Sequence, residues 1–250
     1  MRTIWLGQVD YRAAWELQRE LAALRADGSI NDLLLLLEHP RTITLGRGFH
    51  AENLLHSPES LAASGVALVE TDRGGDVTYH APGQLVGYPI VSLAERGKDV
   101  HAYLRDVEGC IIAALGDLGL EARRLPPHTG VWVGDRKVCA IGIKVSRWVT
   151  MHGFALNVCP DLRGFAMIIP CGIRDKGVTS LTIELGRLVS PRHLVHFMSA
   201  RFTEQFSQSS SAAFPPRAGL SDKMRKLLVS GVDSGGEPVL SCLAVAPPGA

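Results

Sequence analysis

The order of helix-like and strand-like patterns along the chain is the feature that most restricts its fold. Strand-like runs of apolar and β-branched residues occur in groups between helices instead of alternating with them one by one. That order favours an α+β fold over a doubly wound parallel sheet. We expect helices over 11–26, 100–118 and 191–206, single strands over 33–38, 42–45, 66–71 and 84–93, and a β-rich region over 131–158.

Each predicted helix begins with a residue that can cap its free backbone N–H groups. Asp10 and Asp99 precede the first two helices, and Gly119 follows the second. Ser190 followed by Pro191 is a cap with proline at the first helical position. These signals, together with apolar residues at helical spacing, predict three amphipathic helices, and the second of them should pack on a sheet.

The strands carry two local signals. Pro89 lies inside the run 84–93, and proline is tolerated in a strand only at an edge or a bulge. In 131–158, a Gly134–Asp135 turn separates stretches of alternating apolar residues. This region is therefore predicted to form an antiparallel meander.

The chain reads as one domain followed by a tail. Its 250 residues are 46% hydrophobic, which is enough for a single globular core. Residues 207–250 are rich in Ser, Gly, Pro and Ala and lack sustained periodicity. We therefore expect a catalytic or binding domain over 1–206 and a low-complexity, mobile tail over 207–250.

Composition argues against nucleic-acid binding, membrane insertion and secretion. The 26 basic and 25 acidic side chains give a net charge of +1, so a nucleic-acid partner is not expected. Purely apolar runs such as 33–37 are far shorter than a membrane span, and charged residues interrupt the N-terminus before a signal sequence could form. Five cysteines without a C-x-x-C pair indicate reduced thiols in a cytoplasmic protein.

Charge is nevertheless uneven along the chain. Residues 121–180 hold 9 basic and 4 acidic side chains, a net of +5. This segment either presents a basic patch to an acidic protein partner or carries its charges scattered over a solvated surface.

The stretch 73–84 contains the densest cluster of unusual residues. Adjacent Gly74 and Gly75 allow positive φ and close approach of a ligand to the backbone, which would suit a ligand-binding wall. The alternative is a glycine-rich turn with a solvent-facing His80. The stretch matches neither a dinucleotide-binding nor a P-loop fingerprint.

Cys171 and two lysines are candidates for nucleophilic chemistry. Cys171 follows an apolar run and lies in a Pro-Cys-Gly turn, which should expose its thiol at a strand end. A nearby cation would stabilise the thiolate, and the β-rich region offers Lys137 and Lys144. These lysines are seven residues apart, so they would face opposite sides of a regular strand and only one could face the site.

Histidines add weaker candidates. Cys171 with His80 or His152 would make a Cys-His hydrolase pair, and two histidines among His80, His128 and His152 with a cysteine would suggest zinc, but the spacing supports neither. We assign His80 and His152 to pocket walls or hydrogen bonds and predict no metal site.

Three motifs in order resemble the lipoyl(octanoyl) transferase family. They are RGGDVTYHAPGQLVGYPI at 73–90, GVWVGDRKVCAIGIKVSRWVTMHGFALNV at 130–158 and PCGI at 170–173, supported by GVTSL at 177–181. The resemblance extends from about residue 5 to about residue 206. Members of this family move an octanoyl group from acyl carrier protein to a lysine of lipoyl domains, the first step of endogenous protein lipoylation.

The resemblance implies a fold, a reaction and partners. The fold is the mixed or antiparallel sheet flanked by helices that biotin and lipoate protein ligase catalytic domains share. The reaction is octanoyl (or lipoyl) transfer through a cysteine thioester, without cofactor or metal. The donor is octanoyl-acyl carrier protein, and the acceptors are lipoyl domains of 2-oxoacid dehydrogenase complexes and the glycine cleavage H protein.

The resemblance also assigns roles to residues. By the resemblance, Cys171 is the nucleophile and Lys137 its partner; the family's Gly-Ile-Arg stretch carries a basic residue where Lys144 stands, so Lys144 is left out of the catalytic pair. The substrate-contacting positions are Arg73, Gly74, Gly75, Asp76, Val77, Thr78, Tyr79, His80, Ala140, Ile141, Gly142, Gly153, Phe154 and Ala155.

Two departures from the family pattern bear on the site. Ala81 replaces a glycine of the family's Tyr-His-Gly-Pro-Gly form, which stiffens the loop. Cys139 replaces an alanine near Lys137, and leaves open a second reactive thiol or a disulfide with Cys171.

The sequence leaves two alternatives to acyl transfer. One is an ATP-dependent lipoate or biotin protein ligase, and the other is a protein that only binds an acyl chain or lipoyl domain.

Overall fold

The computed structural model describes residues 1–173, 175–207, 221–222, 226 and 232–233. In chain order, its elements are β1 (Arg2–Gln8), α1 (Tyr11–Ala26), β2 (Leu33–Glu38), β3 (Thr42–Leu45), η1 (Ala51–Asn53), α2 (Pro58–Ala63), β4 (Ala67–Glu70), β5 (Val77–His80), β6 (Gln84–Ile90), α3 (Val100–Gly116), β7 (Arg123–Leu125), β8 (His128–Val133), β9 (Arg136–Ser146), β10 (Val149–Asn157), η2 (Leu162–Met167), η3 (Pro170–Gly172), β11 (Gly177–Val178), α4 (Leu181–Leu185), α5 (Pro191–Phe206) and β12 (Val232–Asp233), where η marks a 3₁₀ helix.

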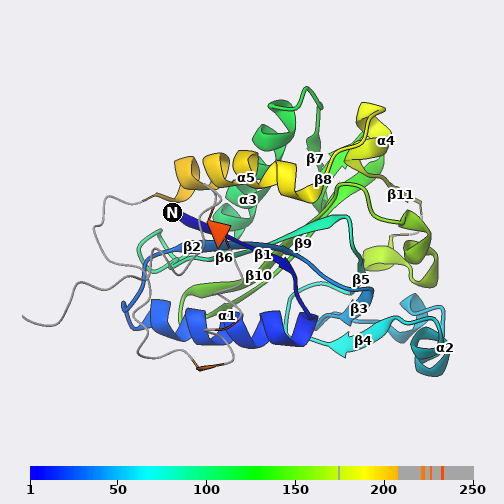
Figure 1. The fold of residues 1–250 in the computed structure, drawn as a ribbon, viewed down its shortest axis with the longest axis horizontal. Helices are drawn as coiled ribbons and strands as arrows, with labels where there is room; N and C mark the ends of the chain where they lie inside the picture. Colours follow the sequence, from blue (N-terminus) through cyan, green and yellow to red (C-terminus); the bar gives the residue numbers. More distant parts are fainter. Residues whose placement is uncertain (174, 208–220, 223–225, 227–231, 234–250) are drawn as a thin grey trace, which may run out of the picture.

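A large mixed sheet crosses the molecule. Its described strands lie in the order β12-β1-β2-β6-β10-β9-β8-β7, and β11 pairs with β9. β1 and β2 are parallel, whereas the neighbours from β2 through β6, β10 and β9 to β8 are antiparallel. A smaller sheet, β4-β3-β5, flanks it (Figure 1). The predicted α+β class and the antiparallel meander of β8, β9 and β10 are confirmed.

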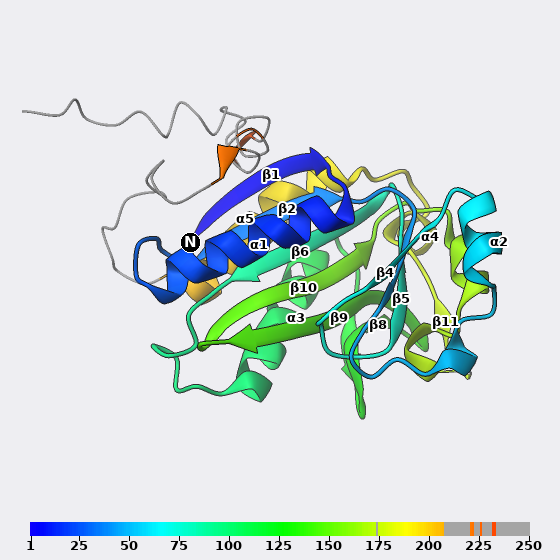
Figure 2. The same ribbon diagram turned by 90° about the horizontal axis from the view of Figure 1, so that it is seen from below.

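Helices cover both faces of the large sheet. α1 lies on one face, and α3 and α5 lie on the other (Figures 1 and 2). Along β2, Leu34 and Leu36 belong to the core under α3 and α5, whereas Leu33, Leu35 and Leu37 belong to the core under α1. A strand buried on both faces needs apolar residues at every position, which explains the uninterrupted leucine run.

The predicted caps of the three long helices are confirmed. A side-chain oxygen of Asp10 accepts a hydrogen bond from Ala13 N at 3.0 Å. Asp99 accepts from His101 N and Ala102 N at 2.8 and 2.9 Å. The cap at Ser190, which accepts from His193 N, precedes a proline at the start of α5. These bonds satisfy N–H groups that have no partner inside the helix.

Pro89 lies in an interior strand at a place where the pairing with one neighbouring strand is interrupted. On the β2 side it is opposite Leu34, but pairing of β6 with β10 ends at Gly87 opposite Phe154. Proline offers no N–H to a neighbour on that side, so the position acts as a local edge. The carbonyl of Pro89 instead accepts a hydrogen bond from the Thr150 hydroxyl at 2.7 Å.

Several elements carry no sequence signal strong enough to predict them. They include the strand β1, the short helix α4, and β5, which the sequence suggests is a loop. The short helix α2 is also unpredicted, although it begins with a Ser57–Pro58 cap like that of α5. Most of the predicted tail lies outside the described residues. Within its described part, Val232 and Asp233 pair with Trp5 and Ile4 of β1, and Ser221 donates two hydrogen bonds to Glu20. No helix in the described ranges is both long and apolar enough to cross a membrane.

Candidate active site

Cys171 lies in the short helix η3, between Pro170 and Gly172. Its side chain lies outside the described part of the structure, whereas its backbone and both neighbours lie within it. Ile169 N donates to Asn53 O at 2.9 Å, and Gly172 N donates to Ile169 O at 3.1 Å. Gly172 adopts φ +68°, a left-handed conformation that glycine accepts without strain. The turn that carries Cys171 is therefore tied to η1.

Asp76 supports the same turn indirectly, through hydrogen bonds to the η1 segment. Its carboxylate accepts hydrogen bonds from Asn53 Nδ2, His50 N and Val77 N. Asn53 thus connects the two segments: its side-chain amide donates to Asp76, and its backbone carbonyl accepts from Ile169 N. The buried carboxylate of Asp76 fixes η1 and the start of β5, and it does not line the cavity described below.

An irregularity in β9 sets the direction of Lys137. Trp132 is opposite Lys137 and its neighbour Val131 is opposite Cys139, so Val138 is an extra residue, a β-bulge. Beyond the bulge the alternation of β9 is reversed, and Lys137 faces the same side as Ala140, with which it lines a small pocket. The expectation that Lys137 and Lys144 face opposite sides is therefore wrong, because it assumed a regular strand.

Lys137 is buried at the junction of two openings. The small pocket, which we call the junction pocket, is lined by Lys137, Thr78, Ala140, Ala155 and Pro170 among others. A larger outer pocket is lined by Lys137 together with Gly172 and His128. Pro170 and Gly172 flank Cys171, so Lys137 borders the turn that carries the cysteine. The Lys137 ammonium also lies 4.8 Å from the centre of the Trp132 ring.

A mostly apolar cavity, here called the inner cavity, adjoins the junction pocket and shares Thr78, Ala140 and Ala155 with it. It lies between the glycine-rich segment 73–80 and the centres of β9 and β10. Ten predicted substrate-contacting residues line it: Arg73, Gly75, Thr78, His80, Ala140, Ile141, Gly142, Gly153, Phe154 and Ala155. Gly74 lines the outer pocket instead.

The segment around Arg73 forms a lid over β9. Gly74 N donates to Ile143 O at 2.8 Å, and the buried Arg73 guanidinium donates to Thr44 O at 2.7 Å. A Cβ atom on Gly142 would lie 2.8 Å from Gly74 O, so glycine is required for this close approach. The glycines therefore line the walls of the inner cavity and the outer pocket, and His80 is buried, not solvent-facing.

Val77 and Tyr79 are predicted contacts that the structure places elsewhere. Both side chains belong to the core of the small sheet. Because alternate residues of β5 face opposite sides, Thr78 and His80 face the inner cavity while Val77 and Tyr79 face away. Tyr79 packs against Phe165, with ring centres 5.5 Å apart.

The histidines of the inner cavity are buried and bonded. His80 Nδ1 lies 2.8 Å from Gln84 Oε1, and burial lowers the pKa of His80 well below its usual value. His152 Nε2 lies 2.7 Å from Asp72 Oδ1. Burial lowers the pKa of His152 despite that carboxylate. Both rings are therefore neutral near pH 7, in the wall and hydrogen-bonding roles predicted for them.

Asp72 joins His152 to Lys144. Lys144 Nζ donates to Asp72 Oδ2 at 2.6 Å. Although burial acts in the opposite direction, the bonds from His152 and Lys144 hold the pKa of Asp72 below its usual value. Lys144 is thus engaged in an ion pair with the carboxylate that also bonds His152.

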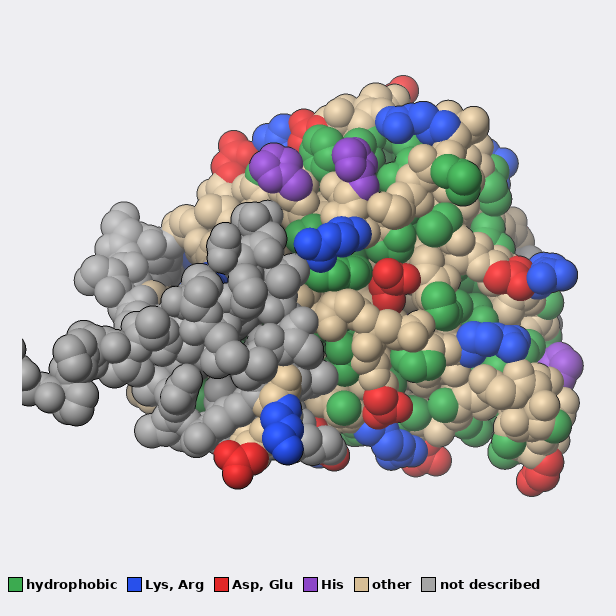
Figure 3. All heavy atoms as spheres, viewed as in Figure 1, with side chains coloured by type: hydrophobic (Ala, Val, Ile, Leu, Met, Phe, Trp, Pro, Cys, Tyr) green, Lys and Arg blue, Asp and Glu red, His purple; other side chains and the backbone are tan. Residues whose placement is uncertain are grey.

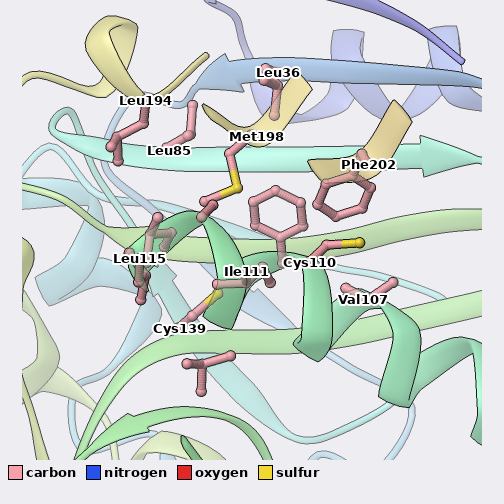
Figure 4. Close-up of a cluster of buried hydrophobic side chains, with 14 of the residues drawn as sticks. Leu36, Leu85, Val107, Cys110, Ile111, Leu115, Cys139, Leu194, Met198 and Phe202 are labelled. Atoms are coloured by element: carbon pink, nitrogen blue, oxygen red, sulfur yellow. The ribbon is translucent and has the colours of Figure 1, made fainter. Parts of the chain in front are cut away.

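Cys139 is a core residue. The bulge turns it away from Lys137, into the apolar cluster with Ile111 and Leu115 under α3 (Figure 4). Its thiol is fully buried, and burial raises the pKa of Cys139 far above its usual value. A thiol in this state is unreactive, which argues against a second nucleophile.

The basic segment 121–180 carries many paired charges. Within it or with neighbouring elements, ion pairs join Arg123 and Lys176 to Asp135, Arg136 to Glu184, Lys144 to Asp72 and Arg163 to Asp161. On the face in Figure 3, basic and acidic side chains are interspersed. This distribution favours scattered charges over a single basic patch.

No cluster of three or more His, Cys, Asp or Glu side chains suited to a metal occurs among the described residues.

Two residues that line the inner cavity were not predicted from the sequence: Tyr11 of α1 and Tyr88 of β6. Both lie at apolar positions of their elements, so nothing in the sequence distinguishes them from core residues.

The model of the lipoyl protein ligase A/B catalytic domain matches residues 10–203. The chain belongs to this family. A curated octanoyltransferase of Chloroflexus aurantiacus is 53% identical over 213 residues, covering 83% of this chain and 96% of the relative. The octanoyltransferase of Solibacter usitatus is 51% identical, covering 86% and 95%.

Solved structures share the fold at much lower identity. A putative lipoate protein ligase from T. acidophilum has a TM-score of 0.66 and 19% identity, covering 90% of this chain and 91% of that one. A biotin protein ligase from Aquifex aeolicus has a TM-score of 0.52 and 15% identity, covering 82% and 69%. These likenesses confirm the predicted ligase-like fold and say nothing further about the reaction.

Proposed function

We propose that this protein is an acyltransferase that moves an octanoyl group from acyl carrier protein to a lysine of lipoyl domains, through a thioester on Cys171. The observation that carries the proposal is the position of Lys137. Its side chain borders both neighbours of Cys171 and stands where the outer pocket and the inner cavity approach each other. High identity to curated octanoyltransferases supports the same reaction.

The inner cavity would hold the acyl chain. Small or apolar side chains such as Ala140, Ala155 and Phe154 line it, and they suit a saturated chain. Burying its seven methylene and methyl carbons at about 0.8 kcal/mol each contributes roughly 5–6 kcal/mol before binding costs. The remaining predicted contacts, Arg73 and the glycines beside it, would cover the chain from above.

In the first step, the Cys171 thiolate attacks the carbonyl carbon of the donor thioester. A new C–S bond forms, the C–S bond to the donor arm breaks, and the Lys137 ammonium gives its proton to the departing thiolate. In the second step, the amine of the acceptor lysine attacks the acyl-cysteine. Neutral Lys137 takes a proton from that amine, and the Cys171 thiolate is released.

The oxyanion of each tetrahedral intermediate needs hydrogen-bond donors. The N–H groups of Gly74 and Gly172 already donate to Ile143 O and Ile169 O. The Lys137 ammonium is a charged donor at the same junction in the first step. The thioester supplies an activated acyl group, so we assign no role to ATP, a metal or another cofactor.

The partners follow from this chemistry. The donor is octanoyl-acyl carrier protein, and the acceptors are lipoyl domains of 2-oxoacid dehydrogenase complexes and the glycine cleavage H protein. A reactive thiol is preserved under reducing conditions, so we propose that the reaction takes place in the cytoplasm. We keep the domain boundary near residue 206, with the segment 207–250 as a tail outside the catalytic unit.

The test is transfer without ATP. Purified protein is mixed with octanoyl-acyl carrier protein and a lipoyl domain, and the mass of the lipoyl domain is followed. We expect one octanoyl group to be added by the wild type and none by Cys171→Ser. Transfer that requires free octanoate with ATP and survives Cys171→Ser would contradict the proposal in favour of a ligase. Binding of a partner without transfer would favour a protein that only holds the acyl chain.

A further inference from the structure

The backbone of His152 is unusual for the middle of a strand. His152 lies in β10 with φ +56°, a left-handed conformation that is uncommon for residues other than glycine. Strain of this kind persists only where surrounding contacts enforce it, and it is concentrated at functional sites. His152 lines the inner cavity, so this backbone has a consequence for the substrate.

The left-handed backbone turns the His152 ring out of the regular alternation. Phe154, two residues later, packs into the core under α3 and α5. The His152 ring instead lies on the α1 side, 5.8 Å from the ring of Trp15. The buried Gln18 of α1 accepts a hydrogen bond from His152 N at 2.6 Å and so holds the backbone in place.

The ring is fixed at both nitrogens. Nε2 donates to Asp72 Oδ1 at 2.7 Å, and Nδ1 accepts from the Tyr11 hydroxyl at 3.4 Å. Asp72 is in turn held by Lys144. The exposed fraction of His152 is 1%, so this is a rigid, buried wall and not a mobile side chain.

His152 lies at the end of the inner cavity that is remote from Lys137. The cavity meets the junction pocket at Ala155 and Ala140, and on β10 it extends back through Gly153 to His152. The next residue, Met151, packs into the core under α1. Three residues of strand span about 10 Å, which sets the depth available to an extended acyl chain.

We propose that His152, backed by Asp72 and Tyr11, is the end wall that limits the length of the acyl chain. This inference rests on the proposed octanoyl transfer and adds a specificity-determining residue to it. A saturated chain longer than the cavity would have to displace a ring held by two hydrogen bonds and a fixed backbone. Chains of eight carbons or fewer would not meet this barrier.

The test measures acyl-enzyme formation with octanoyl-, decanoyl- and dodecanoyl-acyl carrier protein by intact mass. His152→Gly removes the ring and suits the positive φ, and His152→Asn tolerates the same backbone while retaining a polar group for Asp72. Each further methylene that the enlarged cavity can bury favours acylation about fourfold, so the two extra methylenes of decanoyl favour it on the order of tenfold. We expect His152→Gly to raise decanoyl relative to octanoyl acylation on the order of tenfold, and His152→Asn to raise it less.

Ile111→Val is the matched control. It removes a methylene from the core on the opposite face and should leave the chain-length ratio unchanged. A folded His152→Gly with the wild-type ratio would overturn the inference. So would wild-type protein that accepts dodecanoyl as well as octanoyl, whether or not either variant folds. Absence of any octanoyl adduct on the wild type would instead contradict the proposed function itself.

Discussion

Lys137 lies at a mostly apolar junction, beside an aromatic ring. Only 7% of it is exposed, and its ammonium lies over the face of Trp132, where the ring quadrupole attracts positive charge. The bulge at Val138 is what directs it there. Lys144, by contrast, is committed to Asp72 near the end wall.

This difference predicts unequal effects of two alanine substitutions. Lys137→Ala should lower the rate of octanoyl transfer on the order of a hundredfold or more, because it removes the group that exchanges protons with the leaving thiol and the incoming amine. Lys144→Ala should retain most of the transfer rate. Single-turnover transfer rates of the two variants test this prediction, and equal losses of rate would contradict the assignment of Lys137 as the catalytic lysine.

Gly142 gives a second prediction at the same scale. Gly142→Ala would place a methyl group 2.8 Å from Gly74 O and push the lid of the inner cavity away from β9. We expect a loss of about 1–3 kcal/mol in the free energy of unfolding and weaker acylation. Gly116→Ala is the control, because at the end of α3 the same methyl enters open space. Urea unfolding that gives equal stability for both variants would contradict this account of the lid.

At the scale of elements, helices were predictable and several strands were not. α1, α3 and α5 combine a cap with long apolar periodicity, and each appears within a few residues of its predicted bounds. β5 was hidden because its four residues are all buried and follow two glycines. The bulge at Val138 depends on pairing with β8, a tertiary property that residue spacing along β9 does not encode.

The candidate site shows the same division. The three motifs identify the segments that meet at Lys137, Cys171 and the inner cavity, because those segments carry unusual residues such as paired glycines. The sequence does not reveal that Tyr11 closes the cavity or that Asn53 ties down η3. Those roles arise from packing between segments distant in the chain.

The Asp99 cap gives a prediction for α3. Asp99→Ala removes the acceptor for two N–H groups and should lower the free energy of unfolding by about 1 kcal/mol. Asp99→Asn keeps an acceptor and should be nearly neutral. Chemical denaturation of the two variants measures these free energies, and the rate of octanoyl transfer per folded molecule should stay at the wild-type value. Equal destabilisation by both would contradict a capping role.

For the whole molecule, buried histidines link stability to pH. His39 is fully buried; Nδ1 lies 2.6 Å from Val9 O and Nε2 lies 2.7 Å from the Tyr88 hydroxyl. Burial lowers the pKa of His39 to about 4 from its usual 6.5. Between those values the unfolded chain binds the proton that the folded protein excludes, so stability is full above pH 6.5 and falls as pH drops towards 4.

We therefore expect the free energy of unfolding to fall between pH 6.5 and 4, with about 3 kcal/mol of the loss from His39. His80 and His152, whose pKa values burial also lowers, add to the same slope. His39→Gln should be less stable at pH 7 and show a shallower dependence on pH. Denaturant titrations at several pH values test this, and a wild-type stability that is constant over this range would contradict it.

The central claim is that Cys171 carries the octanoyl group as a thioester. The most direct measurement is intact-mass spectrometry of the protein mixed with octanoyl-acyl carrier protein, without ATP or metal, for the wild type and Cys171→Ser. We expect one hydroxylamine-labile octanoyl adduct on the wild type and none on the variant. An adduct of equal yield on Cys171→Ser, or no adduct on folded wild-type protein with intact donor, would contradict it.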